Sequence, residues 1–274
     1  MSYFDENKVL VTAEICENHL GDMEMARRMI HEASDAGADI AKFQSYRGTD
    51  VAEDDPERDW FSEVELSDAM HHELKALAEA EGIEFMSSPF TVERAHFLCQ
   101  DLGLTKIKIA SSEMLNFPLL DYVNGHANTV FLSTGLATLD EVKEAVGHLG
   151  KVENLYILHC TTQYPCTDQD ANLCAITTLR EAFPQHKVGF SDHTIGLVAP
   201  LAAVALGATV IEKHFTLAKA LPGTDHVLSV TPEELRQLAS SIRRLEAQLG
   251  RAEKAPVAGE RPIIQFVRTR FAKP

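Results

Sequence analysis

Two histidines stand at the ends of consecutive apolar segments, in positions that suit metal binding. The segments are "VGFSDHTIGL", residues 188–197, and "VIEKHFT", residues 210–216. Each begins as a predicted β-strand and ends in a histidine, His193 or His214, flanked by acidic and hydroxyl side chains. If the two strands are neighbours, their spacing places the histidines about 5 Å apart. Two imidazoles with oxygen donors and open positions suit Mn²⁺, Co²⁺, Zn²⁺ or Fe²⁺.

Lysines and hydroxyls on other strands could bind an anion. In "ADIAKFQ", residues 38–44, and "KIKIASSE", residues 106–113, lysines alternate with apolar residues, so Lys42 and Lys108 lie opposite the apolar face. The apolar faces should contact helices, so the polar faces turn inward. A buried, unpaired charge is costly, which favours a binding site near the strand ends. Hydroxyls placed to donate to the same anion belong to Ser88, Ser111 and Ser133.

From these residues alone, the site combines an anion with a metal-bound oxygen. That combination predicts metal-assisted formation or cleavage of a carbon–carbon bond in a phosphorylated small molecule. Each residue also has a simpler interpretation. A single histidine at a strand end is more often a hydrogen-bonded packing residue, and His71 is expected to be solvated on a helix. The prediction therefore depends on the whole set of residues.

The elements that must position these residues alternate along the chain. Predicted strands lie at residues 9–15, 38–44, 83–88, 106–111, 129–134, 155–160, 187–192 and 209–215. Predicted helices lie at 22–36, 68–81, 92–102, 117–124, 138–148, 172–183, 196–206 and 231–249. Eight strand–helix units predict a parallel α/β fold that closes into a (β/α)8 TIM barrel. The alternative is an open doubly wound sheet, but the chain has no GxGxxG and no Walker A lysine.

Residue types at the segment ends support these bounds. Asp22, Thr91, Thr138 and Thr231 are candidate N-caps at the starts of predicted helices. The longest stretch predicted to be irregular, residues 45–67, is acidic and holds the only tryptophan. A loop of this length in a compact domain is usually functional or mobile.

Composition narrows the classes of partner. The chain of 274 residues has 25 basic and 41 acidic residues, a net charge of −16, which argues against nucleic acid and anionic membranes as partners. No run of about 18 apolar residues predicts a transmembrane helix, and the first residues do not resemble a signal peptide. The five cysteines are scattered and form no CxxC, which favours a reducing, cytoplasmic location.

Nine motifs resemble those of the sialic acid synthase family and occur in the family's order. They span essentially the whole chain: "AEICENHLGD" (13–22), "GADIAKFQ" (37–44), "FMSSPF" (85–90), "KIASSE" (108–113), "LSTG" (132–135), "LHCTTQYP" (158–165), "GFSDHT" (189–194), "IEKHFT" (211–216) and "PGTDH" (222–226). The resemblance implies a homodimeric enzyme that condenses phosphoenolpyruvate with the open-chain aldehyde of N-acetylmannosamine or a related sugar. The products would be a sialic-acid-type 2-keto sugar acid and phosphate.

The resemblance also implies roles for individual residues. A divalent metal, commonly Mn²⁺ with Mg²⁺ or Co²⁺ as alternatives, would be bound by His193 and His214. The residues expected to bind the substrates are Lys42, Gln44, Ser88, Lys108, Ser111, Ser133, Thr162, Tyr164, Ser191 and Asp225. The residues expected to act in catalysis are Glu14, Glu113, Lys108 and Lys42, with Glu14 and Glu113 as candidates for handling the proton of water.

The sequence departs from the family's pattern in four places, one of which is the compact region 46–67, which lacks an asparagine that some members direct at the sugar. Ser88 stands where many members have threonine, and Thr162 where many have asparagine. Members usually continue past a segment like "GERP" (259–262) into a small antifreeze-like domain, whereas this sequence ends at residue 274. We therefore expect a barrel at residues 1–255 and a tail at 256–274, with the choice of sugar the property most affected.

Two other functions remain open at this point. A metal-dependent aldolase or lyase would cleave a sugar acid to pyruvate without releasing phosphate. A non-catalytic barrel that binds a sugar or a phosphometabolite should have lost a metal ligand or Lys108, and neither is lost here. For the synthase, the product could be N-acetylneuraminate, legionaminate, pseudaminate or a shorter keto acid.

Overall fold

Eight parallel strands form a nearly closed barrel in the computed structural model, which describes residues 8–271. The strands are β1 Leu10–Glu14, β2 Ile40–Ser45, β3 Glu84–Pro89, β4 Lys106–Ile109, β5 Thr129–Ser133, β6 Asn154–Cys160, β7 Lys187–Asp192 and β8 Val210–His214. Their hydrogen-bonded order is β3-β2-β1-β8-β7-β6-β5-β4, so β3 and β4 are the two ends of the sheet. These ends lie against each other, and Lys106 Nζ donates to Glu84 Oε1 across the seam at 2.9 Å. The predicted (β/α)8 barrel is confirmed.

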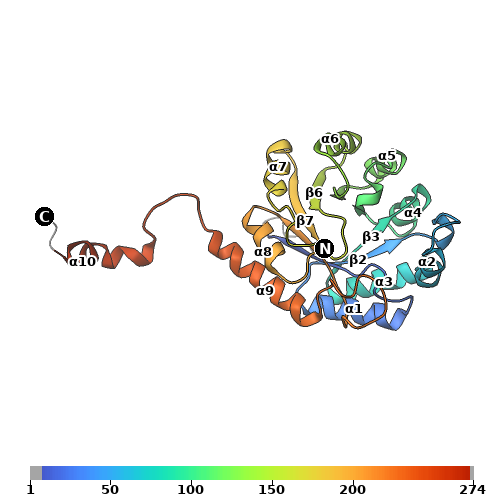
Figure 1. The fold of residues 1–274 in the computed structure, drawn as a ribbon, viewed down its shortest axis with the longest axis horizontal. Helices are drawn as coiled ribbons and strands as arrows, with labels where there is room; N and C mark the ends of the chain where they lie inside the picture. Colours follow the sequence, from blue (N-terminus) through green and yellow to red (C-terminus); the bar gives the residue numbers. More distant parts are fainter. Residues whose placement is uncertain (1–7, 272–274) are drawn as a thin grey trace.

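Helices surround the barrel, as Figure 1 shows. They are α1 Met23–Asp35, α2 Arg58–Val64, α3 Asp68–Glu81, α4 Val92–His96, α5 Phe117–His126, α6 Leu139–His148, α7 Ala175–Ala182, α8 Val198–Ala205, α9 Pro232–Leu249 and α10 Ile264–Thr269. Shorter turns are η1 Gly48–Asp50, the π-helical η2 Phe97–Asp101, η3 Ser111–Glu113 and η4 Ala258–Ile263. After α9 the chain extends away from the barrel to α10 (Figure 1). Within residues 8–271, no helix has the length and apolar character that crossing a membrane requires.

The capping residues read from the sequence begin the helices as expected. The side chain of Asp22 accepts hydrogen bonds from the backbone amides of Glu24 and Met25 at the start of α1. Thr91, Thr138 and Thr231 each accept from the amide three residues later. These bonds satisfy donors that the first turn of a helix otherwise leaves unpaired.

The stretch at residues 45–67 is more regular than the sequence predicts, because it contains α2. A helix of seven residues is too short for its periodicity to stand out in the sequence. Packing stabilises it: the Phe61 ring meets the Tyr46 ring edge-on, with centroids 5.3 Å apart. Trp60 therefore sits on a helix that is anchored against the barrel.

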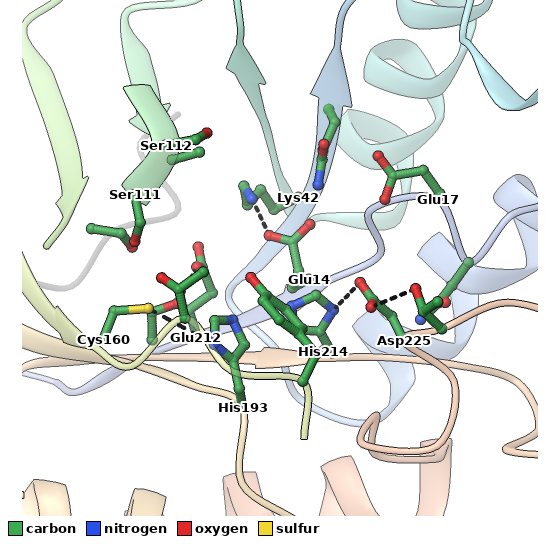
Figure 2. Close-up of a pocket in the computed structure, with 18 of the residues that line it drawn as sticks. Glu14, Glu17, Lys42, Ser111, Ser112, Cys160, His193, Glu212, His214 and Asp225 are labelled. Atoms are coloured by element: carbon green, nitrogen blue, oxygen red, sulfur yellow. Dashed lines mark hydrogen bonds and ion pairs between the residues drawn. The ribbon is translucent and has the colours of Figure 1, made fainter. Parts of the chain in front are cut away.

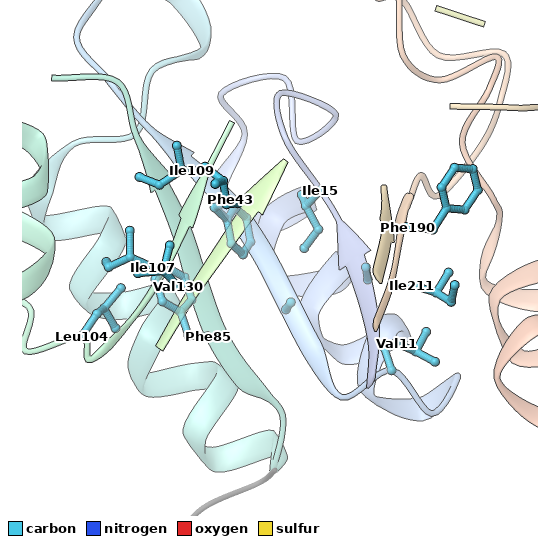
Figure 3. Packing of buried hydrophobic residues seen from close by; sticks show 14 of the residues in the cluster. Val11, Ile15, Phe43, Phe85, Leu104, Ile107, Ile109, Val130, Phe190 and Ile211 are labelled. Carbon is cyan, nitrogen blue, oxygen red and sulfur yellow. The ribbon is translucent and has the colours of Figure 1, made fainter. Parts of the chain in front are cut away.

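The outward face of the strands forms the larger hydrophobic core. Because side chains alternate along a strand, Ile107 and Ile109 of β4 point to the helices, as do Val11 of β1 and Ile211 of β8 (Figure 3). All four side chains are fully buried. This layer holds the helices on the barrel.

The inward face forms a second, smaller core at the N-terminal end of the barrel. Its members are buried side chains from six strands: Leu10, Ile40, Met86, Phe131, Tyr156, Leu158 and Val210. Gly189 of β7 lies within this layer, because an added Cβ would come 2.7 Å from the backbone oxygen of Val210. A glycine there lets neighbouring strands pack closely, and the barrel interior is closed below the site.

Candidate active site

A cavity of about 670 Å³ opens at the C-terminal end of the barrel (Figure 2). It is lined by strand ends and by the loops that follow them, where the active sites of (β/α)8 enzymes lie. The lining residues that the sequence singled out are Glu14, Lys42, Gln44, Lys108, Ser111, Ser133, Thr162, Tyr164, Ser191, His193, His214 and Asp225. The structure thus brings together side chains from across the chain.

Two buried ion pairs form the floor of the cavity. Lys42 Nζ of β2 bonds to Glu14 Oε2 of β1, and both side chains are less than 5% exposed. Lys108 Nζ of β4 lies 3.2 Å from Glu212 Oε1 of β8, and these side chains are equally buried. Ser191 Oγ donates to the same Glu212 oxygen at 2.8 Å. The two carboxylates lie on adjacent strands, β1 and β8, and each is paired with a lysine.

Burial and charge shift the pKa values of these groups in different directions. Burial raises the pKa of Glu14 to about 7, although Lys42 opposes the shift. Burial would also raise the pKa of Glu212, but Lys108 and Lys42 lower it to about 2. Burial lowers the pKa of Lys108, whereas for Lys42 the charges of Glu14 and Glu212 overcome burial and raise it. Of these two carboxyls, Glu212 therefore stays an anion, and Glu14 gains a proton more readily.

Several hydroxyls around the lysines are buried without a partner in the part of the chain that the structure describes. They are Ser88 Oγ, Ser133 Oγ and Thr162 Oγ1. Ser111 Oγ accepts from the backbone amide of Gly135 at 3.0 Å. An added Cβ on Gly135 would approach Ser111 Oγ at 2.8 Å and would collide with Thr162 Oγ1. The glycine therefore keeps open the space that these hydroxyls share, and unpaired buried hydroxyls indicate a ligand.

The two histidines lie side by side, with ring centroids 5.2 Å apart, close to the separation predicted from strand spacing. His193 Nδ1 lies 2.8 Å from the backbone oxygen of Thr161. A carbonyl only accepts, so Nδ1 carries the proton and Nε2 keeps its lone pair for a ligand. His214 uses Nδ1 toward Asp225 Oδ2, at 3.3 Å. This donor set fits a divalent cation.

Sequence reasoning missed three acidic or thiol groups at the cavity. Cys16 and Glu17 lie two and three residues after Glu14, the last residue of β1, and their position near a strand end was the signal available. Cys16, His214 and Asp225 offer ligand atoms that all lie within 4.8 Å of one another. Burial, with Asp225 and Glu14, raises the pKa of Glu17 to about 8. Cys160 also lines the cavity, with Sγ 3.9 Å from His193 Nδ1.

The outer wall of the cavity is aromatic and acidic. The stretch at 45–67, whose length predicted a functional or mobile loop, contributes Glu57, Trp60 and Phe61 to the lining. Tyr164 lies over His193, with ring centroids 4.1 Å apart. The mouth therefore offers flat apolar surfaces beside hydrogen-bond acceptors.

Two predicted site residues do not line the cavity. Glu113 lies on η3, and its Oε2 accepts a hydrogen bond from Asn116 Nδ2 at 2.8 Å. Ser88 is fully buried on β3, where it is paired in register with Gln44 of β2. Ser88 thus lies one strand away from a lining residue, whereas the carboxylate of Glu113 is bonded to its own turn.

Polar groups are also buried outside the barrel. Lys213 Nζ bonds to Asp192 Oδ2 at 2.7 Å, and neither side chain is exposed. Since Asp192 precedes His193 and Lys213 precedes His214, this outward pair ties the two strand ends together behind the histidines. His71 is fully buried between the rings of Phe85 and Phe97, so the expectation that it is solvated is wrong.

Comparisons with known proteins agree with this geometry. The sequence profile of the NeuB family matches residues 29–254. The N,N'-diacetyllegionaminic acid synthase of Legionella pneumophila is 39% identical, over 94% of this chain and 78% of the relative. The N-acetylneuraminate-9-phosphate synthase of Mus musculus is 34% identical, over 89% of this chain and 72% of the relative.

A solved structure extends the likeness to the fold. The crystal structure of N-acetylneuraminic acid (sialic acid) synthetase from Leptospira borgpetersenii, in complex with citrate, superposes with a TM-score of 0.89 at 35% identity. The match covers 96% of this chain and 93% of that one. The barrel fold is therefore shared with a sialic acid synthetase.

Proposed function

This chain belongs to the NeuB family, and from that premise we propose that it is a transferase that forms a carbon–carbon bond. It condenses phosphoenolpyruvate with the open-chain aldehyde of N-acetylmannosamine or a related amino sugar. The products are a sialic-acid-type 2-keto sugar acid and inorganic phosphate. Two relatives are named as synthases of N,N'-diacetyllegionaminic acid and of N-acetylneuraminate 9-phosphate. These products suggest the kinds of amino sugar that the acceptor of this chain could be.

The observation that carries this proposal is the floor of the cavity. Lys42 and Lys108 are buried and line the same cavity as Ser133 and Thr162, whose hydroxyls are buried without a partner among the described residues. Buried ammonium groups and unpaired donors together destabilise an empty site and stabilise a bound anion. Phosphoenolpyruvate carries a phosphate and a carboxylate, so it supplies acceptors for both lysines and for the hydroxyls.

The chain's residues would then orient the enol for attack. With the carboxylate and the phosphate held by Lys42 and Lys108, C3 of the enol faces the aldehyde carbon that comes from the mouth of the cavity. As C3 bonds to the aldehyde carbon, the C2–C3 double bond and the carbonyl double bond open. The aldehyde oxygen takes up a proton and becomes a hydroxyl, and water adds at the electron-deficient C2. The resulting tetrahedral carbon expels phosphate and leaves the 2-keto acid. Positioning the two reactants in this way is the main contribution that the barrel makes.

Glu14 is the carboxylate that we assign to take the proton from the attacking water. Its Oε2 bonds to Lys42, and its Oε1 is buried with no partner within residues 8–271. Because Glu113 lies off the cavity and is bonded to Asn116, we retain Glu14 as the proton acceptor.

His193 and His214 would hold the divalent ion, for which Mn²⁺ is our first choice and Mg²⁺ or Co²⁺ the alternatives. A divalent ion at this position supplies Lewis-acid polarisation of the aldehyde oxygen. Gln44, Tyr164 and Asp225 line the outer part of the cavity, where they would bind the sugar hydroxyls and the amide. Trp60 offers an apolar surface for an N-acyl group.

The test is a panel of aldoses offered with phosphoenolpyruvate and Mn²⁺, with phosphate release and product mass as readouts. We expect one phosphate per keto acid formed, and the best acceptor identifies the sugar. Product without phosphate would instead support the aldolase or lyase. Anion binding without turnover on any acceptor would support a non-catalytic barrel.

Two further properties follow as proposals. The five cysteines are free, which suits a reducing cytoplasm. The family resemblance indicates a homodimer, which sedimentation of the purified protein would test.

A further inference from the structure

We propose that Cys16, Asp225 and the Nδ1 atom of His214 form a three-ligand site for a thiophilic divalent cation, such as Zn²⁺ or Co²⁺. The proposal concerns a different donor set from the two histidines assigned above, and it shares only the ring of His214 with that pair. It stands on geometry, backbone conformation and the surrounding hydrogen bonds.

The three ligand atoms form a nearly equilateral triangle. Cys16 Sγ lies 3.4 Å from His214 Nδ1 and 3.5 Å from Asp225 Oδ2, and the nitrogen and oxygen lie 3.3 Å apart. Metal–ligand bonds of about 2.3 Å to sulfur and about 2.1 Å to nitrogen or oxygen give tetrahedral edges of about 3.6 Å and 3.4 Å. The triangle therefore matches one face of a tetrahedral site without rearrangement.

The backbone at Cys16 is unusual for a residue with a side chain. Its φ is 41°, in the left-handed region that glycine adopts readily and other residues adopt at a cost. Here this conformation directs the thiol at His214 and Asp225, and the side chain is 1% exposed. A strained backbone that places a nucleophilic or ligating atom is typical of a functional position.

A buried asparagine holds the three ligand-bearing segments together. Asn18 Nδ2 donates to the backbone oxygen of Phe215, next to His214, at 2.8 Å, and to Ser229 Oγ at 3.0 Å. Ser229 Oγ in turn donates to the backbone oxygen of Asp225 at 2.6 Å. Asn18 itself lies two residues after Cys16. The cluster thus has the supporting hydrogen bonds that metal sites need around their ligands.

Access and ligand type also favour a cation. His214 and Asp225 line the cavity, so an ion can enter from solvent, and three protein ligands leave a fourth position for water or substrate. Glu17 lines the same cavity, and its Oε1 is buried with no partner among the residues described. The thiol favours a soft metal over Mg²⁺.

Titration of metal-free protein with Co²⁺, without substrates, tests the site. The signature of a bound thiolate is a near-ultraviolet charge-transfer band from sulfur to cobalt. We expect one equivalent of Co²⁺ to produce this band in the unaltered protein. Cys16→Gly should abolish the band, and glycine suits the left-handed backbone, so a thermal melt should show an intact fold. Cys99→Ser, which removes another buried cysteine, should keep it.

Two further measurements sharpen the assignment. His193→Ala should keep the band, because His193 is outside the proposed ligand set. Competition with a chelator should show that Cys16→Gly weakens Cd²⁺ binding by about tenfold or more and Mn²⁺ binding much less. Cys16→Ser repeats the test if the glycine variant does not fold.

The proposal is overturned if the unaltered protein shows no band, if the band survives removal of Cys16, or if it is lost with His193→Ala. The three atoms would then be a hydrogen-bonded cluster only. None of these readouts uses catalysis, so the synthase proposal stands or falls separately through phosphate release.

Discussion

The two ends of the barrel interior are built from the same strand faces but have opposite chemistry. Toward the N-terminal end, inward residues such as Ile40 and Val210 are apolar and fully buried. Two residues further along the same strands, Lys42 and Glu212 are charged and almost as deeply buried. Two residues along a strand, which is one repeat of side-chain alternation, therefore separate the apolar packing layer from the charged floor of the cavity.

The difference shows which layer stabilises the fold. Burying a large apolar side chain contributes about 1.5–3 kcal/mol each, whereas burying an ion pair is at best close to neutral. Replacing a buried ion pair by apolar side chains of similar volume is often neutral or stabilising, so stability does not account for the charged layer. It is therefore the layer that serves binding, and the apolar layer is the one that serves stability.

The largest expected effect comes from breaking the charged layer. Lys108→Met leaves Glu212 as an unpaired buried charge, so the free energy of unfolding should fall by about 3–5 kcal/mol. Phosphoenolpyruvate affinity should fall by roughly 10- to 100-fold, because a charged hydrogen-bond partner is lost. Chemical denaturation and calorimetry measure the two quantities.

The paired replacement separates these effects. Lys108→Met combined with Glu212→Leu should recover most of the lost stability but none of the affinity, since it replaces the ion pair by apolar groups. Lys106→Met is the matched control, because Lys106 lies on the same face of β4 and bonds to Glu84 at the seam. If Lys108→Met leaves the affinity unchanged, Lys108 does not belong to the anion site.

A smaller effect, on stability alone, is expected in the apolar layer. Leu158 is fully buried against Gly189, so Leu158→Ala should lower the free energy of unfolding by about 3 kcal/mol. The affinity for phosphoenolpyruvate should stay the same, as measured by calorimetry below the unfolding transition. Leu158→Met, which conserves volume, should cost less than about 1.5 kcal/mol. A loss of affinity in Leu158→Ala would show that the two layers are coupled.

The smallest expected effect lies outside the barrel, at His71 on α3. Burial lowers the pKa of His71 to about 4; Arg94 also lowers it, whereas the Ser67 carbonyl and Asp68 oppose the shift. Its folded pKa is below the unfolded value, so the unfolded state binds more protons between the two, and stability is lost as pH falls from about 6.5 toward 4. Through His71, the free energy of unfolding should be about 2 kcal/mol lower at about pH 5 than at about pH 7.

Urea unfolding at the two pH values measures this loss. His71→Phe keeps a ring between Phe85 and Phe97 and should reduce the pH dependence by that amount. His19, whose pKa burial also lowers to about 4, remains in both proteins and cancels in the comparison. An unchanged slope in His71→Phe would mean that His71 does not titrate on unfolding.

Local patterns in the sequence determined the strands, the helix starts and the face on which each charged residue lies. Alternation along a strand is a local property, so Lys42 and Lys108 could be assigned to the inward face before any partner was known. The capping residues Asp22 and Thr138 work in the same way, because a cap bonds to amides two or three residues away.

Only the tertiary structure decided which side chains meet. The pairing of Lys42 with Glu14 and of Lys108 with Glu212 depends on how the strands close into a barrel, which no short segment encodes. The same is true of Cys16, whose thiol reaches residues 214 and 225 through a left-handed backbone turn, and of Glu113, whose turn carries it off the cavity. Contacts between residues distant in sequence depend on closure and loop conformation, and these are properties of the whole chain.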